Sequence, residues 1–325
     1  MRATLSLLDR SRTRDGEDDA AALRQTMRRA ALAESAGYHR FWVAEHHAVP
    51  GVASGHPALL ISAIADRTRR IRVGSGGVML PNHQPIVVAE QFAMLEALYP
   101  GRIDLGVGRS LGFTAPIRAA LRTEHAPADE FAADVAELRA YLFGQAPVSI
   151  RPQVPRPPPI FVLGTGRGLE LAARLGLPAV AGGPLLWRGP EPFERYRNDF
   201  RPHTDGAEPH LAISLDILIA DTASEAEELR LPEAWAMAVS RDTGSFPPLS
   251  STATIRGHEL TARRRRIITE HAKTAVVGTD EQVGERLDDL IAKTGAEEVM
   301  STASAFDTDA LYASDARLAQ LFGLG

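Results

Sequence analysis

Short apolar runs alternate with longer amphipathic segments along most of the chain. A continuous apolar run of about four to eight residues that ends in polar residues is typical of a buried parallel strand. Apolar positions three or four residues apart predict a helix. Strands are predicted at 3–8, 41–44, 71–75, 102–107, 160–163, 177–181, 211–220 and 298–302. Helices are predicted at 19–36, 57–68, 85–98, 129–143, 169–175, 191–200, 280–293 and 307–322.

This alternation predicts parallel strands joined by right-handed helical crossovers. Eight such units in 325 residues fit one α/β domain, 1–325, with the (β/α)8 architecture of a TIM barrel. An open doubly wound sheet is the alternative. The pattern fails between about 231 and 270, where Pro232, Gly244 and the pair Pro247-Pro248 interrupt it. We therefore expect an irregular insertion late in the barrel, or a partly disordered segment.

Glu45, His46 and His47 directly follow the predicted strand 41–44. In a parallel α/β protein the carboxyl ends of the strands carry ligand and catalytic sites. One of the histidines is therefore a candidate acid–base or hydrogen-bonding group. The alternative is a strand-end loop whose polar side chains only hydrogen-bond the backbone. A metal site is disfavoured, because the spacing His-Glu-x-x-His is absent and no third ligand stands out.

Small residues end the predicted strand 71–75. Ser75, Gly76 and Gly77 would let a planar ligand lie against the backbone, or would simply form a tight turn. Asn82 and His83 in the following loop could face the same pocket, but a solvated loop is the favoured interpretation.

Two further segments could bind an anionic group. Arg109 follows the predicted strand 102–107, where a guanidinium suits an anion, although an ordinary surface arginine is the alternative. The loop 164–168 joins a strand to a helix, so its free N–H groups and Thr165 could hold a phosphate. The acidic residue that a dinucleotide site places about 20 positions further on is missing. A mononucleotide phosphate is therefore favoured over NAD.

Composition narrows the class of protein. The chain is 44% hydrophobic and 24% charged, with a net charge of −5 and both signs mixed throughout. This is typical of a soluble globular enzyme and argues against a nucleic-acid surface or a polybasic membrane patch. The absence of cysteine excludes disulfides, thiolate catalysis and Cys-ligated metals. Because there is no signal-peptide core and no apolar run near the ~20 residues of a membrane span, we expect a cytoplasmic protein.

Three motifs, in this order and spacing, resemble those of the bacterial-luciferase-like flavin-dependent monooxygenases. They are Phe-Trp-Val-Ala-Glu-His-His at 41–47, Ile-Arg-Val-Gly-Ser-Gly-Gly-Val-Met-Leu-Pro at 71–81, and Pro-Gly-Arg-Ile-Asp-Leu-Gly-Val-Gly-Arg at 100–109. The resemblance continues through Leu163-Gly164 and through Val-Val-Gly-Thr at 276–279. It is strong over 1–145, moderate over 155–220 and 273–322, and absent from the irregular segment.

The resemblance implies a (β/α)8 barrel that uses reduced FMN, supplied by a separate flavin reductase, to activate O2. A C4a-peroxyflavin then oxidises a small organic metabolite, whereas some relatives use the deazaflavin F420 for hydride transfer. We therefore expect an FMNH2-dependent monooxygenase. The alternatives are an F420-dependent oxidoreductase and a non-catalytic flavin-binding barrel. The resemblance also implies a homodimer formed by helices from the first half of the barrel.

Carried over to matching positions, the resemblance makes His46 the active-site histidine at the flavin C4a–N5 edge. It implies that Glu45 packs its backbone against the flavin and that Gly76-Gly77 is a non-prolyl cis peptide under the isoalloxazine ring. The other expected flavin-binding residues are Ser75, Arg109, Ser110, Leu111, Leu163, Gly164, Thr165 and Gly166.

The chain departs from the family pattern in its phosphate loop. The loop 164–168 is one residue shorter than is usual, and Thr165 alone supplies a hydroxyl. Two outcomes are open: Arg167 compensates for the missing hydroxyl groups, or the affinity for FMN is reduced.

Overall fold

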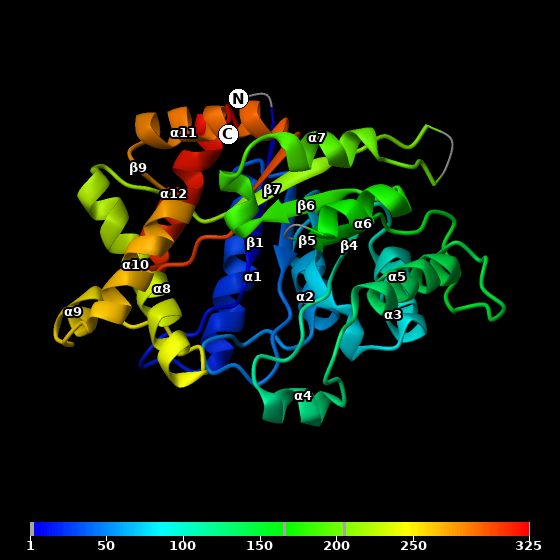
Figure 1. The fold of residues 1–325 in the computed structure, drawn as a ribbon, viewed down its shortest axis with the longest axis horizontal. Helices are drawn as coiled ribbons and strands as arrows, with labels where there is room; N and C mark the ends of the chain where they lie inside the picture. Colours follow the sequence, from blue (N-terminus) through cyan, green and yellow to red (C-terminus); the bar gives the residue numbers. More distant parts are fainter. Residues whose placement is uncertain (1–2, 165–166, 204–205, 325) are drawn as a thin grey trace.

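The computed structural model describes residues 3–164, 167–203 and 206–324. Eight parallel strands close into a barrel in the order β1-β10-β7-β6-β5-β4-β3-β2, and helices surround them (Figure 1). The barrel strands are β1 (Thr4–Asp9), β2 (Arg40–Val43), β3 (Arg72–Met79), β4 (Ile103–Gly108), β5 (Ile160–Gly164), β6 (Ala179–Gly182), β7 (Leu211–Leu215) and β10 (Glu298–Ser301). The predicted TIM barrel is confirmed, and the open sheet is excluded.

Helices connect successive strands, as the alternating pattern predicts. They are α1 (Asp19–Ser35), α2 (Pro57–Arg67), α3 (Pro85–Leu98), α4 (Ala115–Leu121), α5 (Ala128–Leu142), α6 (Arg167–Leu175), α7 (Glu191–Asn198), α8 (Ala223–Thr243), α9 (Thr252–Arg256), α10 (Ala262–Thr274), α11 (Asp280–Thr294) and α12 (Thr308–Leu321). The 3-10 turns η1 (Leu80–Asn82) and η2 (Gly183–Trp187) follow β3 and β6. Within the described ranges, we find no helix with the length and apolar character to cross a membrane.

Alternate residues of each strand face opposite sides of the barrel wall. On β2, Phe41 packs outward in the large apolar cluster beneath the helices, and Trp42 packs inside the barrel in a smaller one. The Trp42 ring meets Phe161 of β5 edge-on, with 5.0 Å between ring centroids. Both faces of the wall are therefore buried, which explains why the strands are continuous apolar runs.

Charged side chains fill the amino end of the barrel interior. Arg40 on β2 pairs with Asp104 on β4 at 2.8 Å and with Glu298 on β10 at 3.0 Å. His210 also hydrogen-bonds Glu298, at 3.0 Å. Because both carboxylates are completely buried, each depends on these partners to offset the cost of desolvation.

The expected strand 211–220 is wrong in its second half. β7 ends at Leu215, and after Asp216 the chain forms β8 (Ile217–Ile219), which leaves the barrel and pairs in parallel with β9 (Val276–Gly278). The strand predicted to end near Ser75 instead continues through Gly76 and Gly77 to Met79. Its register against β4 shifts between Ser75 and Val78.

The expectation of irregular structure between 231 and 270 also needs correction. Helix α8 runs to Thr243 with Pro232 inside it, and Gly244 ends it in the left-handed conformation at φ 72°. Helices α9 and α10 follow, and α8, α9 and α10 lie together beside the barrel (Figure 1). From the sequence, proline and glycine were both expected to interrupt regular structure here. Gly244 does end the helix, but tertiary packing keeps α8 intact through Pro232.

The interior carboxylates predict an acid-sensitive barrel. Burial raises the pKa of Glu298, but His210 and Arg40 outweigh it and lower that pKa to about 2. Its stabilising effect is therefore complete above the unfolded value of 4.5 and is lost as pH falls toward 2. At pH 7 we expect wild type to have a larger free energy of unfolding than Glu298→Gln. Urea titrations should show that this difference shrinks by about 2 kcal/mol between pH 7 and about pH 3. A difference that stays constant with pH would contradict this assignment.

Candidate active site

A cavity of about 1090 Å³ opens at the carboxyl ends of the barrel strands. This cavity is lined by nine of the residues that were predicted from the sequence to bind flavin or to be catalytic: Glu45, His46, Gly76, Gly77, Arg109, Ser110, Leu111, Leu163 and Gly164. Thr165 and Gly166 lie outside the described residues. Ser75 does not line the cavity. Its buried hydroxyl instead donates to the Gly106 carbonyl at 2.8 Å and accepts from the Gly106 N–H at 3.0 Å, which joins β3 to β4.

Glycines form one wall of this cavity. The peptide bond between Gly76 and Gly77 is cis, as the resemblance implies. A side chain at Gly77 would start 2.8 Å from the Gly106 carbonyl oxygen, and one at Gly106 would run directly into the Ser75 carbonyl. The backbones of β3 and β4 therefore approach closely, and this wall presents bare backbone to a ligand.

His46 lies at the edge of the same cavity. Its main chain is fixed, because its N–H donates to the Ser54 carbonyl at 2.9 Å. Its Nδ1 is buried and has no hydrogen-bond partner among the described residues. The pKa of His46 is lowered to about 4, mainly by burial and further by the charges of Arg10 and Arg12. The imidazole is therefore neutral near pH 7.

Arg10 joins the cavity to a network of buried charges beneath it. Its guanidinium lies 3.2 Å from Glu233 of α8 and 3.4 Å from Asp216, and it donates to the Thr302 carbonyl at 2.9 Å. Arg12 holds the other oxygen of Glu233 at 2.9 Å. Burial raises the pKa of Asp216, but Arg10 outweighs it and holds that pKa below its usual range.

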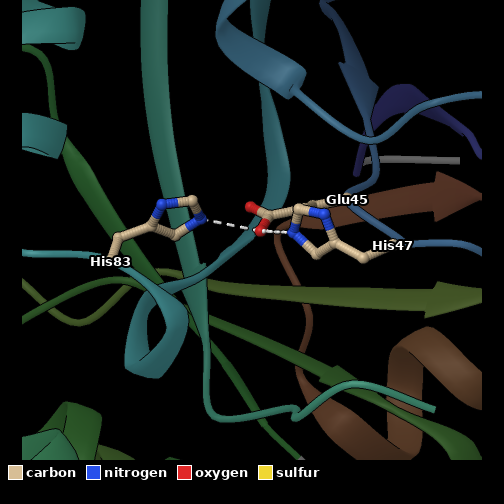
Figure 2. A group of neighbouring side chains, drawn as sticks. All are labelled: Glu45, His47 and His83. Atoms are coloured by element: carbon tan, nitrogen blue, oxygen red, sulfur yellow. Dashed lines mark hydrogen bonds and ion pairs between the residues drawn. The ribbon is translucent and has the colours of Figure 1, made fainter. Parts of the chain in front are cut away.

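Glu45 and two histidines form a compact cluster beside the cavity (Figure 2). The Glu45 Oε1 atom lies 2.6 Å from His47 Nε2 and 2.7 Å from His83 Nε2. Burial raises the pKa of Glu45, but the bonds from His47 and His83 outweigh it and lower that pKa to about 2. The expected solvated loop at His83 is wrong, and so is the view that no third candidate ligand exists. Sequence spacing could not show this, because η1 folds His83 back toward β2.

Several cavity residues were not singled out from the sequence. They are Leu8, Arg10, Met79, Phe113, Arg174, Val180, Ser214 and Thr302. Arg167, the candidate that could compensate for the short phosphate loop, lines the cavity as well. Arg10 and Thr302 directly follow barrel strands, so the strand-end rule could have found them once the strands were assigned. Arg174 lies in the last turn of α6, and no sequence signal places it at the cavity.

A second cavity of about 1010 Å³ lies at the opposite, amino end of the barrel. The proline-rich segment 153–159 covers it, together with Arg40, Arg72 and His210. These polar groups already pair with Asp104 and Glu298. In TIM barrels this face serves stability, whereas the carboxyl edge carries chemistry. We therefore place the active site at the carboxyl edge.

A family model described as "Luciferase-like monooxygenase" matches residues 1–298. The chain belongs to the luciferase-like monooxygenase family. A luciferase-like monooxygenase of Escherichia coli strain K12 is 34% identical over 94% of this chain and 92% of its own length. The crystal structure of apo-MsnO8, another similar protein, shares 32% identity and a TM-score of 0.88, and covers 99% of both chains.

Some of the proteins that are similar to this member of the luciferase-like monooxygenase family have names that state a reaction or a cofactor. An N-acetyl-S-alkylcysteine monooxygenase of Bacillus subtilis is 38% identical over 69% of this chain and 70% of its own length. Two more distant structures share the fold. One is the oxygenating constituent of 3,6-diketocamphane monooxygenase in complex with FMN, at 18% identity and TM-score 0.72. The other is an F420-dependent secondary alcohol dehydrogenase, at 16% identity and TM-score 0.68.

The glycine wall predicts a contrast between two neighbouring substitutions on β4. A methyl group at Gly106 would collide with the backbone of β3, whereas at Gly108 nothing lies within 4 Å of the added carbon. We expect Gly106→Ala to lower the free energy of unfolding by about 3 kcal/mol and Gly108→Ala to leave it nearly unchanged. Urea denaturation of both variants measures this. Equal stability of the two variants would show that β3 and β4 are not in this close contact.

Proposed function

We propose that this protein is a monooxygenase that uses reduced FMN and O2 to oxidise a small organic metabolite. The observation that carries the proposal is the position of His46. His46 lines the same cavity as the bare backbone of Gly76 and Gly77. A planar ring lying on that backbone would bring its edge toward the imidazole. The family membership and the named monooxygenases within it support the same reaction class.

The residues present fit a flavin mononucleotide. A cavity of about 1090 Å³ is large enough, and its glycine wall gives a flat ring a surface without side chains. Arg109, Ser110, Arg167 and Arg174 also line the cavity, and they would hold the phosphate. When bound, reduced flavin supplies the electrons that activate O2. Arg167 and Arg174 support compensation for the short phosphate loop rather than loss of binding.

His46 would act on the flavin edge through its imidazole. The hydrogen bond from the His46 N–H to Ser54 holds the residue in place beside the network of Arg10, Glu233 and Asp216. A fixed donor or acceptor costs little reorganisation during reaction. We therefore assign His46 to hold or move a proton at its imidazole.

The substrate class and the cofactor distinguish the rival functions. The N-acetyl-S-alkylcysteine monooxygenase relative makes thioethers a reasonable first panel of substrates. F420-dependent structures that share the fold keep hydride transfer as the alternative. A barrel that binds flavin without turnover is the third candidate, but the position of His46 on the cavity argues against it.

We expect the wild-type protein to bind reduced FMN in anaerobic titrations more tightly than reduced F420. With a flavin reductase, NADH, a thioether panel and ¹⁸O2, the product should contain one ¹⁸O atom. His46→Ala should lower the rate of oxygen transfer by about 100-fold or more while binding reduced FMN as wild type does, because general acid–base groups contribute on this scale. Mass spectrometry measures the oxygen that is transferred to the substrate. Release of hydrogen peroxide measures the oxygen that is reduced without being transferred.

Each alternative gives a different result in this experiment. Tight F420 binding, with oxidation of an alcohol when oxidised F420 is supplied as the hydride acceptor and no ¹⁸O incorporation, would identify an F420-dependent oxidoreductase. Flavin binding without turnover on any substrate of the panel would favour the non-catalytic barrel. Wild-type oxygen transfer by His46→Ala would remove the assignment of His46 and leave the rest of the proposal intact.

We also propose that the protein is a homodimer formed through α2 and α3. Three large apolar side chains on these helices face solvent: Leu59, Met94 and Leu98 are 74%, 54% and 63% exposed. Neighbouring exposed apolar side chains of this size are typical of an interaction surface. The early helices of the barrel are also the dimer contact that the family resemblance implies.

The double substitution Met94→Glu with Leu98→Glu should convert the dimer to monomer. Uncompensated charge in an apolar interface costs several kcal/mol, so the dimer dissociation constant should rise at least about 100-fold. Light scattering coupled to size exclusion measures the mass. Val148→Glu is the matched control, because Val148 is 57% exposed but lies between α5 and β5, outside the two helices of the proposed interface. A monomeric wild-type protein would refute the proposal.

A further inference from the structure

The cluster of Glu45, His47 and His83 has the composition of a metal site. The three residues come from different stretches at the carboxyl edge: Glu45 and His47 follow β2, and His83 follows η1. Each offers one ligand atom, and these atoms all lie within 4.8 Å of one another (Figure 2). Two imidazole nitrogens and a carboxylate oxygen are the donors that zinc and other divalent transition metals prefer.

The present hydrogen bonds already converge on one point. Both histidines turn Nε2 toward the same atom, Glu45 Oε1, at 2.6 and 2.7 Å. Ligand atoms around a tetrahedral zinc ion lie roughly 3.4 Å apart, given bonds of about 2.1 Å. An ion would therefore replace the two hydrogen bonds after the side chains move apart by roughly 0.7 Å. The two imidazoles are 16% exposed, which leaves them room to make this movement.

The carboxylate is also held from behind, as metal ligands commonly are. The Glu45 side chain is completely buried, and its second oxygen, Oε2, accepts a hydrogen bond from the Met79 N–H at 3.0 Å. The Ser54 hydroxyl donates to the Ala44 carbonyl at 2.7 Å, which fixes the chain just before Glu45. One oxygen is thus anchored by backbone, and the other is free to bind an ion.

A third imidazole lies on the solvent side of the cluster. The ring of His56 is 6.0 Å from that of His47 and 6.3 Å from that of His83, measured between centroids. His56 is exposed and immediately precedes α2. It can close the fourth side of a tetrahedral site, and its exposure gives an ion a path from solvent.

We propose that Glu45, His47 and His83 bind one divalent transition-metal ion, with Zn²⁺ as the simplest case and His56 as the fourth ligand. His47, His56 and His83 do not line the active-site cavity, whereas Glu45 does. The ion is therefore structural. It joins the loop after β2, which holds His46, to the loop after β3, the strand that carries Gly76 and Gly77. The proposal does not depend on the identity of the cofactor.

The test uses protein without a polyhistidine tag, stripped with a chelator and titrated with Zn²⁺ against a chromogenic competitor. Wild type should bind one equivalent, and Zn²⁺ should raise its melting temperature. Loss of a residue that only hydrogen-bonds a metal ligand lowers metal affinity by about 10- to 100-fold. His83 would bind the ion directly, so we expect His83→Gln to weaken Zn²⁺ binding by at least about 100-fold. Glutamine keeps an N–H for Glu45, so this variant separates metal binding from the hydrogen bond.

His203→Ala is the matched control, because His203 is an exposed histidine between α7 and β7, at the opposite, amino end of the barrel. It should bind Zn²⁺ as wild type does. If His83→Gln does not fold, titration of wild type with Co²⁺ gives an independent answer, since a tetrahedral site produces an intense visible spectrum. Equal Zn²⁺ affinity in wild type, His83→Gln and His47→Gln would overturn the proposal, and so would a wild type that binds no ion.

Discussion

The barrel depends on charges that are buried and paired across intervening strands. Arg40 on β2 reaches over β3 to Asp104 on β4, and over β1 to Glu298 on β10. Backbone hydrogen bonds join only neighbouring strands, whereas these ion pairs join second neighbours. A strand cannot slide along its neighbour without separating a charge from its partner in a medium where that is costly. The register at the amino end therefore fixes where each strand ends at the other edge.

The active-site edge uses the same principle in a different arrangement. Glu233 of α8 is shared by Arg10 and Arg12, two residues of the loop after β1. Arg12 also lies over the Phe246 ring at 4.5 Å and hydrogen-bonds the Gly51 carbonyl. The loops after β1 and β2 are thus tied to a helix that comes some two hundred residues later. Burial of His46 is the main cause of its lowered pKa, and the charges of Arg10 and Arg12 lower that pKa further.

Sequence reasoning predicted the parts of the molecule that depend on local pattern. The barrel strands have both faces buried, so their apolar runs were easy to recognise, and the residues just after them do line the cavity. It failed where long-range packing decides. Pro232 stays inside α8, and Asp216 ends β7 because its carboxylate meets Arg10 and Thr302. His83 belongs with Glu45 only because η1 turns the chain back, which no spacing rule describes.

The sharing of Glu233 has a consequence for how this enzyme family can be re-engineered. Segment 223–250 lies late in the chain, and it would be a natural block to exchange between relatives in a search for new substrates. Here it brings a carboxylate that neutralises two arginines from the opposite end of the sequence. A transplanted block without that carboxylate would leave Arg12 buried without its ion-pair partner and would leave Arg10 with Asp216 alone. The loop after β1 and helix α8 therefore depend on each other, and a chimera must take both from the same parent protein.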